Sequence, residues 1–215
     1  MDQQIFFLIN RTGARPALDG LMATLSCWDF WWPFLIVAMV WIFLAGGFRA
    51  RAMLVTAVIA VGVTDGIVVN SLKHAVGRPR PKDVLEGARS LDLAKAKPRF
   101  LALAKPLQIR STPPGKSPER GNSFPSGHTA NNFAAATVVF LFYRRRGWVA
   151  FLPAGLVAYS RMYVGAHWPT DVAASCVLGT LLAILMVRGM EWLWQRFGGR
   201  VLPGIHLKHP ELSAP

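Results

Sequence analysis

Apolar residues concentrate in five stretches of the chain, separated by polar segments or by segments that contain glycine and proline. The stretches cover residues 31–48, 52–72, 124–143, 147–160 (extendable to 166) and 172–187. Each approaches the roughly 20 apolar residues that a helix needs to cross a bilayer, or the smaller number that suffices where the bilayer thins. The pattern therefore predicts an all-α fold: a polytopic membrane helical bundle of about five transmembrane helices, forming one domain over residues 1–215.

Two segments fall outside this pattern. Residues 2–25 mix apolar side chains such as Phe6 with polar ones such as Asn10 and Arg15, which is typical of a helix lying in the membrane interface. We therefore expect residues 1–25 to form an interfacial segment. Residues 82–122 are rich in proline, glycine and lysine, which predicts an irregular or partly mobile loop. Such a loop is either a solvated tether or a functional element.

The composition favours a membrane protein over a soluble domain, because 53% of the residues are hydrophobic. The net charge of +13 could suit nucleic acid, but no nucleic-acid-binding motif accompanies it. Anionic lipid is the simpler partner for basic residues beside membrane helices, so we expect no nucleic-acid partner. Cys27 and Cys176 lie in or beside apolar runs, and we assign them no disulfide.

Arginines mark one side of a five-span topology. They occur at Arg49, Arg51, residues 144–146 and the tail after residue 187, and these positions alternate along the chain. Short arginine-rich connections are typically cytoplasmic, whereas long loops such as 82–122 weigh little in this rule although this one is also basic. We therefore expect an integral protein of the cell (inner) membrane with loop 82–122 on the extracytoplasmic face.

Three polar stretches lie at the outer ends of the predicted helices. They read "SLKHAVGRPRP" (71–81), "FPSGHT" (124–129) and "YSRMYVGAHWPTD" (159–171). In the second stretch, Pro125 breaks the incoming loop and Ser126 is a good N-cap. We therefore expect a helix N-terminus here, with the backbone N–H groups of Gly127 and His128 exposed. Such a helix end can bind an oxyanion. In a five-span arrangement all three stretches emerge on the same side of the membrane.

The third stretch adds an arginine and a histidine–aspartate pair. His167 and Asp171 are four residues apart, so the carboxylate can accept a hydrogen bond from one ring nitrogen and leave the other more basic. Arg161 lies close to the membrane boundary. Each of these features, taken alone, also has an ordinary structural explanation. The explanations are a capped helix with a surface histidine, a snorkelling arginine and a structural His–Asp pair.

Together with the basic residues of the first stretch, the set fits phosphoryl transfer. Two histidines can serve as nucleophile and acid, while cationic side chains spread positive charge over the phosphoryl oxygens. The basic side chains of the first stretch are Lys73, Arg78 and Arg80. Only one carboxylate belongs to the set, so we expect no metal and no other cofactor.

These residues resemble the three-part motif of the type-2 phosphatidic acid phosphatase superfamily in order and spacing. The matching pieces are Lys73 with Arg80-Pro81, the run Pro125-Ser126-Gly127-His128, and Ser160-Arg161 with His167 and Asp171. Each piece is weak evidence alone, but three in register are highly specific. The resemblance covers about residues 52–187. Six spans are common in the family, so five spans with an interfacial segment would be a departure.

The resemblance implies a helical bundle in which His167 attacks phosphorus to form a phosphohistidine while Asp171 orients its ring. His128 would protonate the leaving group, and water would then hydrolyse the intermediate without a metal. The implied phosphate-binding residues are Lys73, Arg80, Ser126, Gly127 and Arg161. The five apolar spans argue against the soluble vanadium haloperoxidases of the same superfamily, but vanadate should inhibit.

The substrate is expected to be a membrane lipid phosphate in the outer leaflet. We favour undecaprenyl pyrophosphate, with phosphatidylglycerophosphate, phosphatidate and lipid A as alternatives. From another class, a lipid transporter or flippase is suggested by Asp65, Asn70, Asn131 and Asn132 within predicted spans. These residues are expected instead to hydrogen-bond between helices, since no transporter repeat is visible. The oligomeric state is not predicted.

Overall fold

The computed structural model describes residues 1–115 and 120–213, and most of these residues are helical. The α-helices are α1 (Asp2–Phe7), α2 (Pro16–Leu25), α3 (Trp28–Ala45), α4 (Phe48–Val63), α5 (Asn70–Val76), α6 (Pro81–Val84), α7 (Gly127–Gly147), α8 (Phe151–Tyr163), α9 (Pro169–Val201) and α10 (Pro203–His206). Two π-helical segments, η1 (Leu8–Thr12) and η2 (Thr64–Val69), and two 3₁₀ segments, η3 (Arg99–Ala104) and η4 (Trp148–Ala150), extend or connect them. Strands β1 (Arg89–Asp92) and β2 (Gln108–Ser111) form one antiparallel hairpin.

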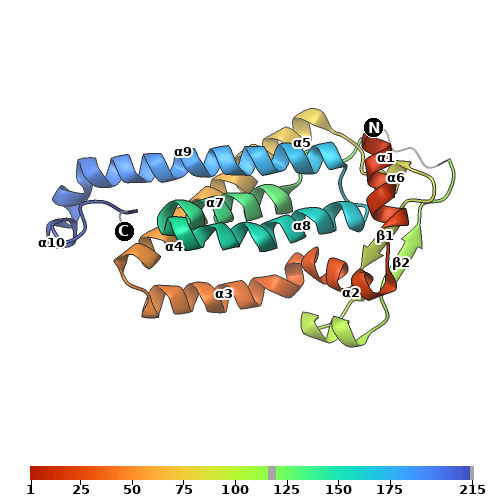
Figure 1. Cartoon of the computed structure of the whole chain (residues 1–215), viewed down its shortest axis with the longest axis horizontal. Helices are drawn as coiled ribbons and strands as arrows, with labels where there is room; N and C mark the ends of the chain where they lie inside the picture. Colours follow the sequence, from red (N-terminus) through yellow and green to blue (C-terminus); the bar gives the residue numbers. More distant parts are fainter. Residues whose placement is uncertain (116–119, 214–215) are drawn as a thin grey trace.

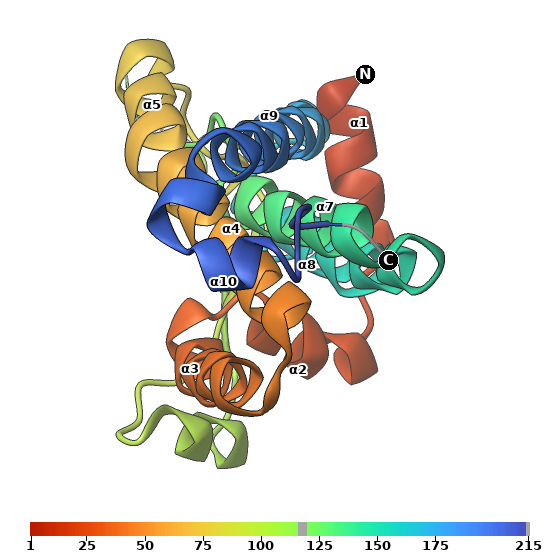
Figure 2. The same ribbon diagram turned by 90° about the vertical axis from the view of Figure 1, so that its left-hand side faces the viewer.

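Helix α7 is the centre of the bundle and packs against α4, α8 and α9 (Figure 1). Its inward face is made of small and apolar residues, and Ala134, Val138 and Phe142 meet Met53 of α4 in one core cluster. At Gly179 of α9 a side chain would collide with the backbone of Ala130, so glycine is what lets α9 pack directly on α7. Figure 2 shows α3 apart from this group, and none of its residues is buried.

The predicted spans are confirmed as helices, but the count of five is not confirmed. Among the described residues, three helical stretches are long and apolar enough to cross a membrane: Trp28–Ala45, Phe48–Val84 and Pro169–Val201. The stretches predicted at 124–143 and 147–160 correspond to α7 and α8 beside them. Helix α8 has 13 residues and would extend only about 20 Å, which is short of a full crossing.

Residues 82–115 form more ordered structure than the composition predicts. The hairpin pairs Arg89 with Ser111 and Asp92 with Gln108, and it lies at the same end of the bundle as α1 and α2 (Figure 1). Local patterning could not predict this pairing, because the strands have only four residues each and β2 is exposed throughout. The part of the predicted loop at 116–119 lies outside the described residues.

A buried polar network joins residues 1–25 to the hairpin and to α8. The fully buried Asn10 donates to the carbonyl oxygens of Arg89 (2.9 Å) and Tyr163 (2.7 Å) and accepts from the Arg89 N–H (2.7 Å). Asp19 pairs with Arg89 (2.8 Å) and accepts from the Tyr163 hydroxyl (2.6 Å). Helix α1 runs across the end of the bundle (Figure 1), which is the orientation expected of an interfacial segment.

Candidate active site

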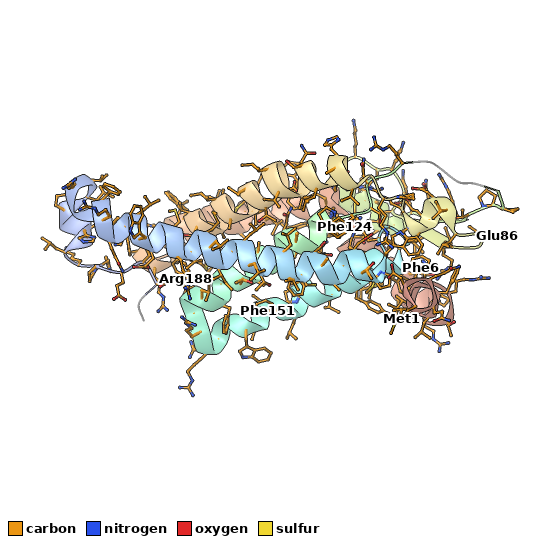
Figure 3. All side chains as sticks on the ribbon, turned by 90° about the horizontal axis from the view of Figure 1, so that it is seen from above. Met1, Phe6, Glu86, Phe124, Phe151 and Arg188 are labelled. Carbon is orange, nitrogen blue, oxygen red and sulfur yellow. The ribbon has the colours of Figure 1, made fainter. Side chains whose placement is uncertain are left out.

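The residues of the three polar stretches all lie at the end of the bundle that carries α1 and the hairpin. Figure 3 shows the labelled Phe6 and Phe124 together at this end and Arg188 far along α9 from them. The short arginine-rich connections after α3 and at the end of α7 are at the other end (Figure 1). The predicted convergence of the candidate residues is therefore present, on the side opposite to these arginines.

Local backbone signals bring the first stretch to this end. Gly77 ends α5 in the left-handed conformation (φ 63°), which redirects the chain after Lys73. Arg80 then takes the N-cap position of α6, and Pro81 occupies the first turn, where a missing N–H costs nothing. Lys73 and Arg80 are thus on two separate helical segments whose ends face the start of α7.

The backbone at the start of α7 lies close to side chains of neighbouring helices. Ser126 is its N-cap, but the hydroxyl contacts Thr129 Oγ1 (2.9 Å) instead of capping a backbone N–H as the sequence suggests. At Gly127 an added Cβ would lie 3.0 Å from Asp65 Oδ1 and 3.7 Å from Lys73 Nζ. The π-helical turn η2 carries Asp65 to this point, and such turns are frequent at functional sites.

His167 is 3% exposed, in the loop between α8 and α9. Its Nδ1 lies 2.5 Å from the backbone carbonyl oxygen of Ser123. Because a carbonyl oxygen only accepts, Nδ1 must carry the hydrogen, which leaves the lone pair of Nε2 available. Burial, followed by the charge of Arg161, lowers the pKa of His167 well below 6.5, so the imidazole is neutral at pH 7.

Asp171 does not make the predicted hydrogen bond to the His167 ring, because the carbonyl of Ser123 occupies that ring nitrogen. Its Oδ2 accepts instead from the Ser123 hydroxyl (2.5 Å) and from the Trp168 backbone N–H (3.1 Å). The carboxylate is fully buried at the start of α9. Asp171 therefore supports His167 indirectly, by fixing the residue whose carbonyl holds the ring.

The sequence suggests that Arg78 binds phosphate, but in the structure its side chain lies between two carboxylates. Its two guanidinium nitrogens pair with Asp171 Oδ1 (2.6 Å) and Asp2 Oδ2 (2.7 Å), and it lies over the Trp168 ring at 4.8 Å. Asp2 also accepts from the backbone N–H (3.0 Å) and hydroxyl (2.8 Å) of Thr170. Burial would raise the pKa of Asp2, but the hydrogen bonds from Thr170 and Arg78 hold it below 3.8.

Sequence reasoning missed Asp2 and Ser123. A single acidic residue ahead of an apolar run gives no hint of a partner 76 residues away in Arg78. The carbonyl that holds His167 belongs to the backbone, and the identity of Ser123 says nothing about it. The only available signal for Ser123 was its position beside the "FPSGHT" stretch.

A cavity of about 270 Å³ opens beside these residues. His128, Arg80 and Arg161 line it on the bundle side. Within residues 1–115 and 120–213, no hydrogen-bond partner is found for the buried His128 Nε2, Arg80 Nε or Arg161 Nε. The rest of the wall comes from α2, the start of α3 and the turn between them, from α6, β1 and η3, and from the loop between α8 and α9. These residues are Ala23, Ser26, Cys27, Trp28, Asp29, Lys82, Leu91, Asp92, Leu93, Arg99, Val164 and Ala166.

This donor set suits an anion. Arg161 is anchored by one nitrogen on the Ser26 carbonyl (3.0 Å), so its guanidinium is held in place before any ligand arrives. Arginine donors with a fixed geometry suit phosphate oxygens, which they can bind through two parallel hydrogen bonds. In the described part of the chain, no group of three or more His, Cys, Asp or Glu side chains could hold a metal ion.

The fold and the cavity define a helical integral membrane protein with a cavity lined by cationic side chains at one end of its bundle. Residues 50–195 match the model of the PAP2 superfamily, and the chain belongs to that superfamily. The resemblance found in the three motifs is thereby confirmed.

Curated relatives and a solved structure agree with this membership. The "Undecaprenyl-diphosphatase" of Sulfolobus acidocaldarius is 30% identical over 190 residues, covering 86% of this chain and 76% of the relative. The "Bacitracin transport permease protein BcrC" of Bacillus licheniformis is 35% identical over 94 residues, covering 40% of this chain and only 46% of the relative. The crystal structure of Aquifex aeolicus LpxE shares the fold, with a TM-score of 0.60 and 24% identity over 87% of this chain and 94% of that one.

Proposed function

We propose that this protein is a lipid phosphate phosphatase that works through a phosphohistidine on His167 without a metal. The observation that carries the proposal is the cavity, where His128, Arg80 and Arg161 present nitrogens that have no hydrogen-bond partner among the described residues. Arg80 and Arg161 also lie within electrostatic range of the neutral His167. Lys73 and the start of α7 at Ser126 and Gly127 complete the proposed phosphate site. Membership of the superfamily and the names of the relatives support the same reaction class.

In the first step, the Nε2 lone pair of His167 forms a bond to phosphorus. The bond between phosphorus and the leaving oxygen breaks, and its electron pair stays on that oxygen. His128 gives a proton to the leaving oxygen, while Arg80 and Arg161 bind the equatorial phosphoryl oxygens. The Ser123 carbonyl, fixed by Asp171, holds the Nδ1–H of His167 and stabilises the positive charge that the ring acquires.

In the second step, a water molecule attacks the phosphorus of the phosphohistidine. The N–P bond breaks, its electron pair returns to Nε2 of His167, and inorganic phosphate leaves. The water's proton goes to His128, which gave up its own proton in the first step. The cycle therefore restores both histidines and consumes one water for each phosphate released.

We assign the site to the extracytoplasmic face of the cell membrane and undecaprenyl pyrophosphate as the substrate. The assignment of the face rests on the arginine-rich connections at the opposite end of the bundle. The name of the Sulfolobus relative, which aligns over most of its length, favours a lipid diphosphate. Phosphatidylglycerophosphate, phosphatidate and lipid A are the competing substrates.

The test is phosphate release by the detergent-purified protein from these four lipids, with a chelator present, beside His167→Ala. The proposal expects release that survives the chelator and disappears in the variant. Protein quenched in alkaline detergent should also carry phosphate in an acid-labile, base-stable form, as a phosphoramidate does. Release from none of the four lipids, or release that needs a metal, would contradict the proposal.

Transport of a lipid is the second candidate, because polar residues lie within predicted spans and one relative is named a bacitracin transport permease. One of these polar residues bonds within its own helix, against the expectation of bonds between helices, and another lies against a neighbouring helix. Asn132 donates to the His128 carbonyl of its own helix (2.9 Å), and Asp65 lies beside Gly127. Lipid flux in proteoliposomes that persists in His167→Ala would favour transport.

A further inference from the structure

The cavity wall carries two cationic side chains that the three motifs do not account for. Beyond Arg80 and Arg161, its wall carries Lys82 and Arg99, and neither belongs to the motif residues. We propose that Lys82 and Arg99 form a second phosphate subsite, which holds the lipid-linked phosphate of a diphosphate while the terminal phosphate faces His167. This inference rests on the proposed function and specifies its substrate class.

The backbone of Lys82 is held by two hydrogen bonds. It follows Arg80 by two residues, and its backbone N–H donates to the carbonyl of Gly165 (3.1 Å), two residues before His167. Its own carbonyl accepts from the Thr112 hydroxyl (2.6 Å) at the end of the hairpin. The backbone of Lys82 is therefore fixed between the third motif and the hairpin, and its ammonium lies within electrostatic range of Arg80 and Arg161.

Arg99 is the second cationic side chain of the proposed subsite. It begins the 3₁₀ segment η3, and its Nη1 donates to the carbonyl of Ala94 (3.0 Å). Its buried Nε finds no hydrogen-bond partner among the described residues. Like Arg161, it is a partly anchored guanidinium with unused donor capacity, which an anion in the cavity would satisfy.

Two carboxylates, Asp29 and Asp92, also line the cavity. Asp92 is exposed and lies within electrostatic range of Lys82. Four cationic side chains still outnumber the two acidic ones along the wall, so the cavity favours an anion. A phosphate bound at Arg80 and Arg161 leaves the Arg99 Nε without a partner among the described residues, whereas the second phosphate of a diphosphate would bind Arg99 and Lys82. A diphosphate therefore uses more of the donors along the wall.

The second subsite also has a chemical role in bond cleavage. When the attacked phosphorus is the terminal one, the leaving group is a lipid monophosphate, and the electron pair of the broken P–O bond stays on its oxygen. Lys82 and Arg99 would stabilise the charge that develops there. A phosphate leaving group with a second pKa near 6 also needs a proton far less than an alkoxide does.

The test compares Lys82→Gln and Arg99→Gln with Lys97→Gln, an exposed lysine on the same segment that does not line the cavity. Kinetically, kcat/KM for undecaprenyl diphosphate should fall about 10- to 100-fold in the first two variants, as expected for losing a hydrogen bond to a charged group. Phosphatidate hydrolysis should change by less than about threefold in all three variants. Lys82→Arg, which keeps the charge, should retain the diphosphate preference.

A binding readout that needs no turnover separates this inference from the proposed function. Cys27 lines the cavity and is a free thiol, so its maleimide labelling in a Cys176→Ala background reports occupancy. Methylenediphosphonate should protect Cys27 at a concentration at least about tenfold lower than inorganic phosphate does, and Lys82→Gln and Arg99→Gln should abolish the difference. Protection by diphosphonate in a protein that hydrolyses no lipid would leave the subsite standing while the proposed function fails.

Two results would overturn the inference. One is equal protection by phosphate and diphosphonate in the unmodified cavity. The other is an equal loss of activity on diphosphate and monophosphate lipids in Lys82→Gln and Arg99→Gln, since the two residues would then act on the reacting phosphate itself.

Discussion

The role expected of Arg78 differs between the sequence and the structure. The sequence groups Arg78 with the phosphate-binding cations, whereas the structure pairs it with two carboxylates. In Arg78→Gln the bonds to Asp2 (2.7 Å) and to the buried Asp171 (2.6 Å) are lost or weakened. Breaking a fully buried ion pair costs about 3–5 kcal/mol, but the Arg78 side chain is 32% exposed and glutamine keeps one amide donor. We therefore expect a loss of about 1.5–3 kcal/mol of stability, the range for hydrogen bonds to charged groups.

The catalytic effect follows from the same contacts. Asp171 fixes Ser123, whose carbonyl fixes His167, so loosening Asp171 lets the imidazole move. A misplacement of about 1 Å can cost about 100-fold in rate. We expect kcat to fall about 10- to 100-fold in Arg78→Gln, with KM and the vanadate inhibition constant within about threefold, because Arg78 does not line the cavity.

The assay is initial-rate phosphate release in detergent micelles across substrate concentrations, together with vanadate titration and thermal unfolding. Arg80→Gln is the matched control, because Arg80 lines the cavity. This substitution should raise KM and weaken vanadate inhibition. Asp2→Asn should repeat the pattern of Arg78→Gln in a milder form. A tenfold rise in KM and in the vanadate constant for Arg78→Gln, with kcat unchanged, would refute the argument and return Arg78 to the phosphate site.

Four further outcomes are expected. His128→Ala should slow phosphatidate hydrolysis far more than diphosphate hydrolysis, because an alcohol leaving group needs the proton and a phosphate does not; equal losses would remove His128 as the acid. Burial and the charge of Arg161 lower the pKa of His167, so the nucleophile stays neutral as the pH falls. In a plot of kcat/KM against pH, the acid limb should therefore lie well below pH 6.5. An acid limb at or above pH 6.5 would contradict the neutral nucleophile. Gly127→Ala places a Cβ 3.0 Å from Asp65 Oδ1 and should lower activity about tenfold or more, whereas Gly155→Ala, with no atom within 4 Å of the new Cβ, should be neutral by the same assay. Vanadate should inhibit competitively in plots of rate against substrate, and no inhibition at millimolar vanadate would argue against the assigned phosphate site.

The positions of the candidate residues could be predicted from the sequence because each one adjoins a long apolar run. Consecutive spans run in opposite directions, so Lys73, His128 and His167 had to reach the same side of the bundle. The boundaries were less accurate: the first span was expected at 31–48, whereas α3 is Trp28–Ala45 and Phe48 begins α4. The glycines at 46 and 47 break the helix, and hydrophobicity alone does not register that break.

The contacts that orient His167 could not be predicted, because they depend on tertiary packing between residues distant in the chain. A spacing of four residues suits a bond from His167 to Asp171, but α9 begins at Pro169, and the first helical turn aims the carboxylate at Ser123 and Trp168. The hairpin that completes the cavity was missed for a similar reason. Its strands gain their stability from contacts with α2 and from Asn10 and Asp19, not from their own four-residue patterns.

The contact between Asp2 and Thr170 spans 168 positions of the chain, and this separation sets the order in which the protein can assemble during synthesis. Helix α1 leaves the ribosome long before its partners at the start of α9 exist, so this contact forms only after the intervening helices have been made. A nascent chain that has already exposed Arg80 and His128 still lacks His167 and Asp171. Under the proposed mechanism, such a chain has no means of attacking phosphorus.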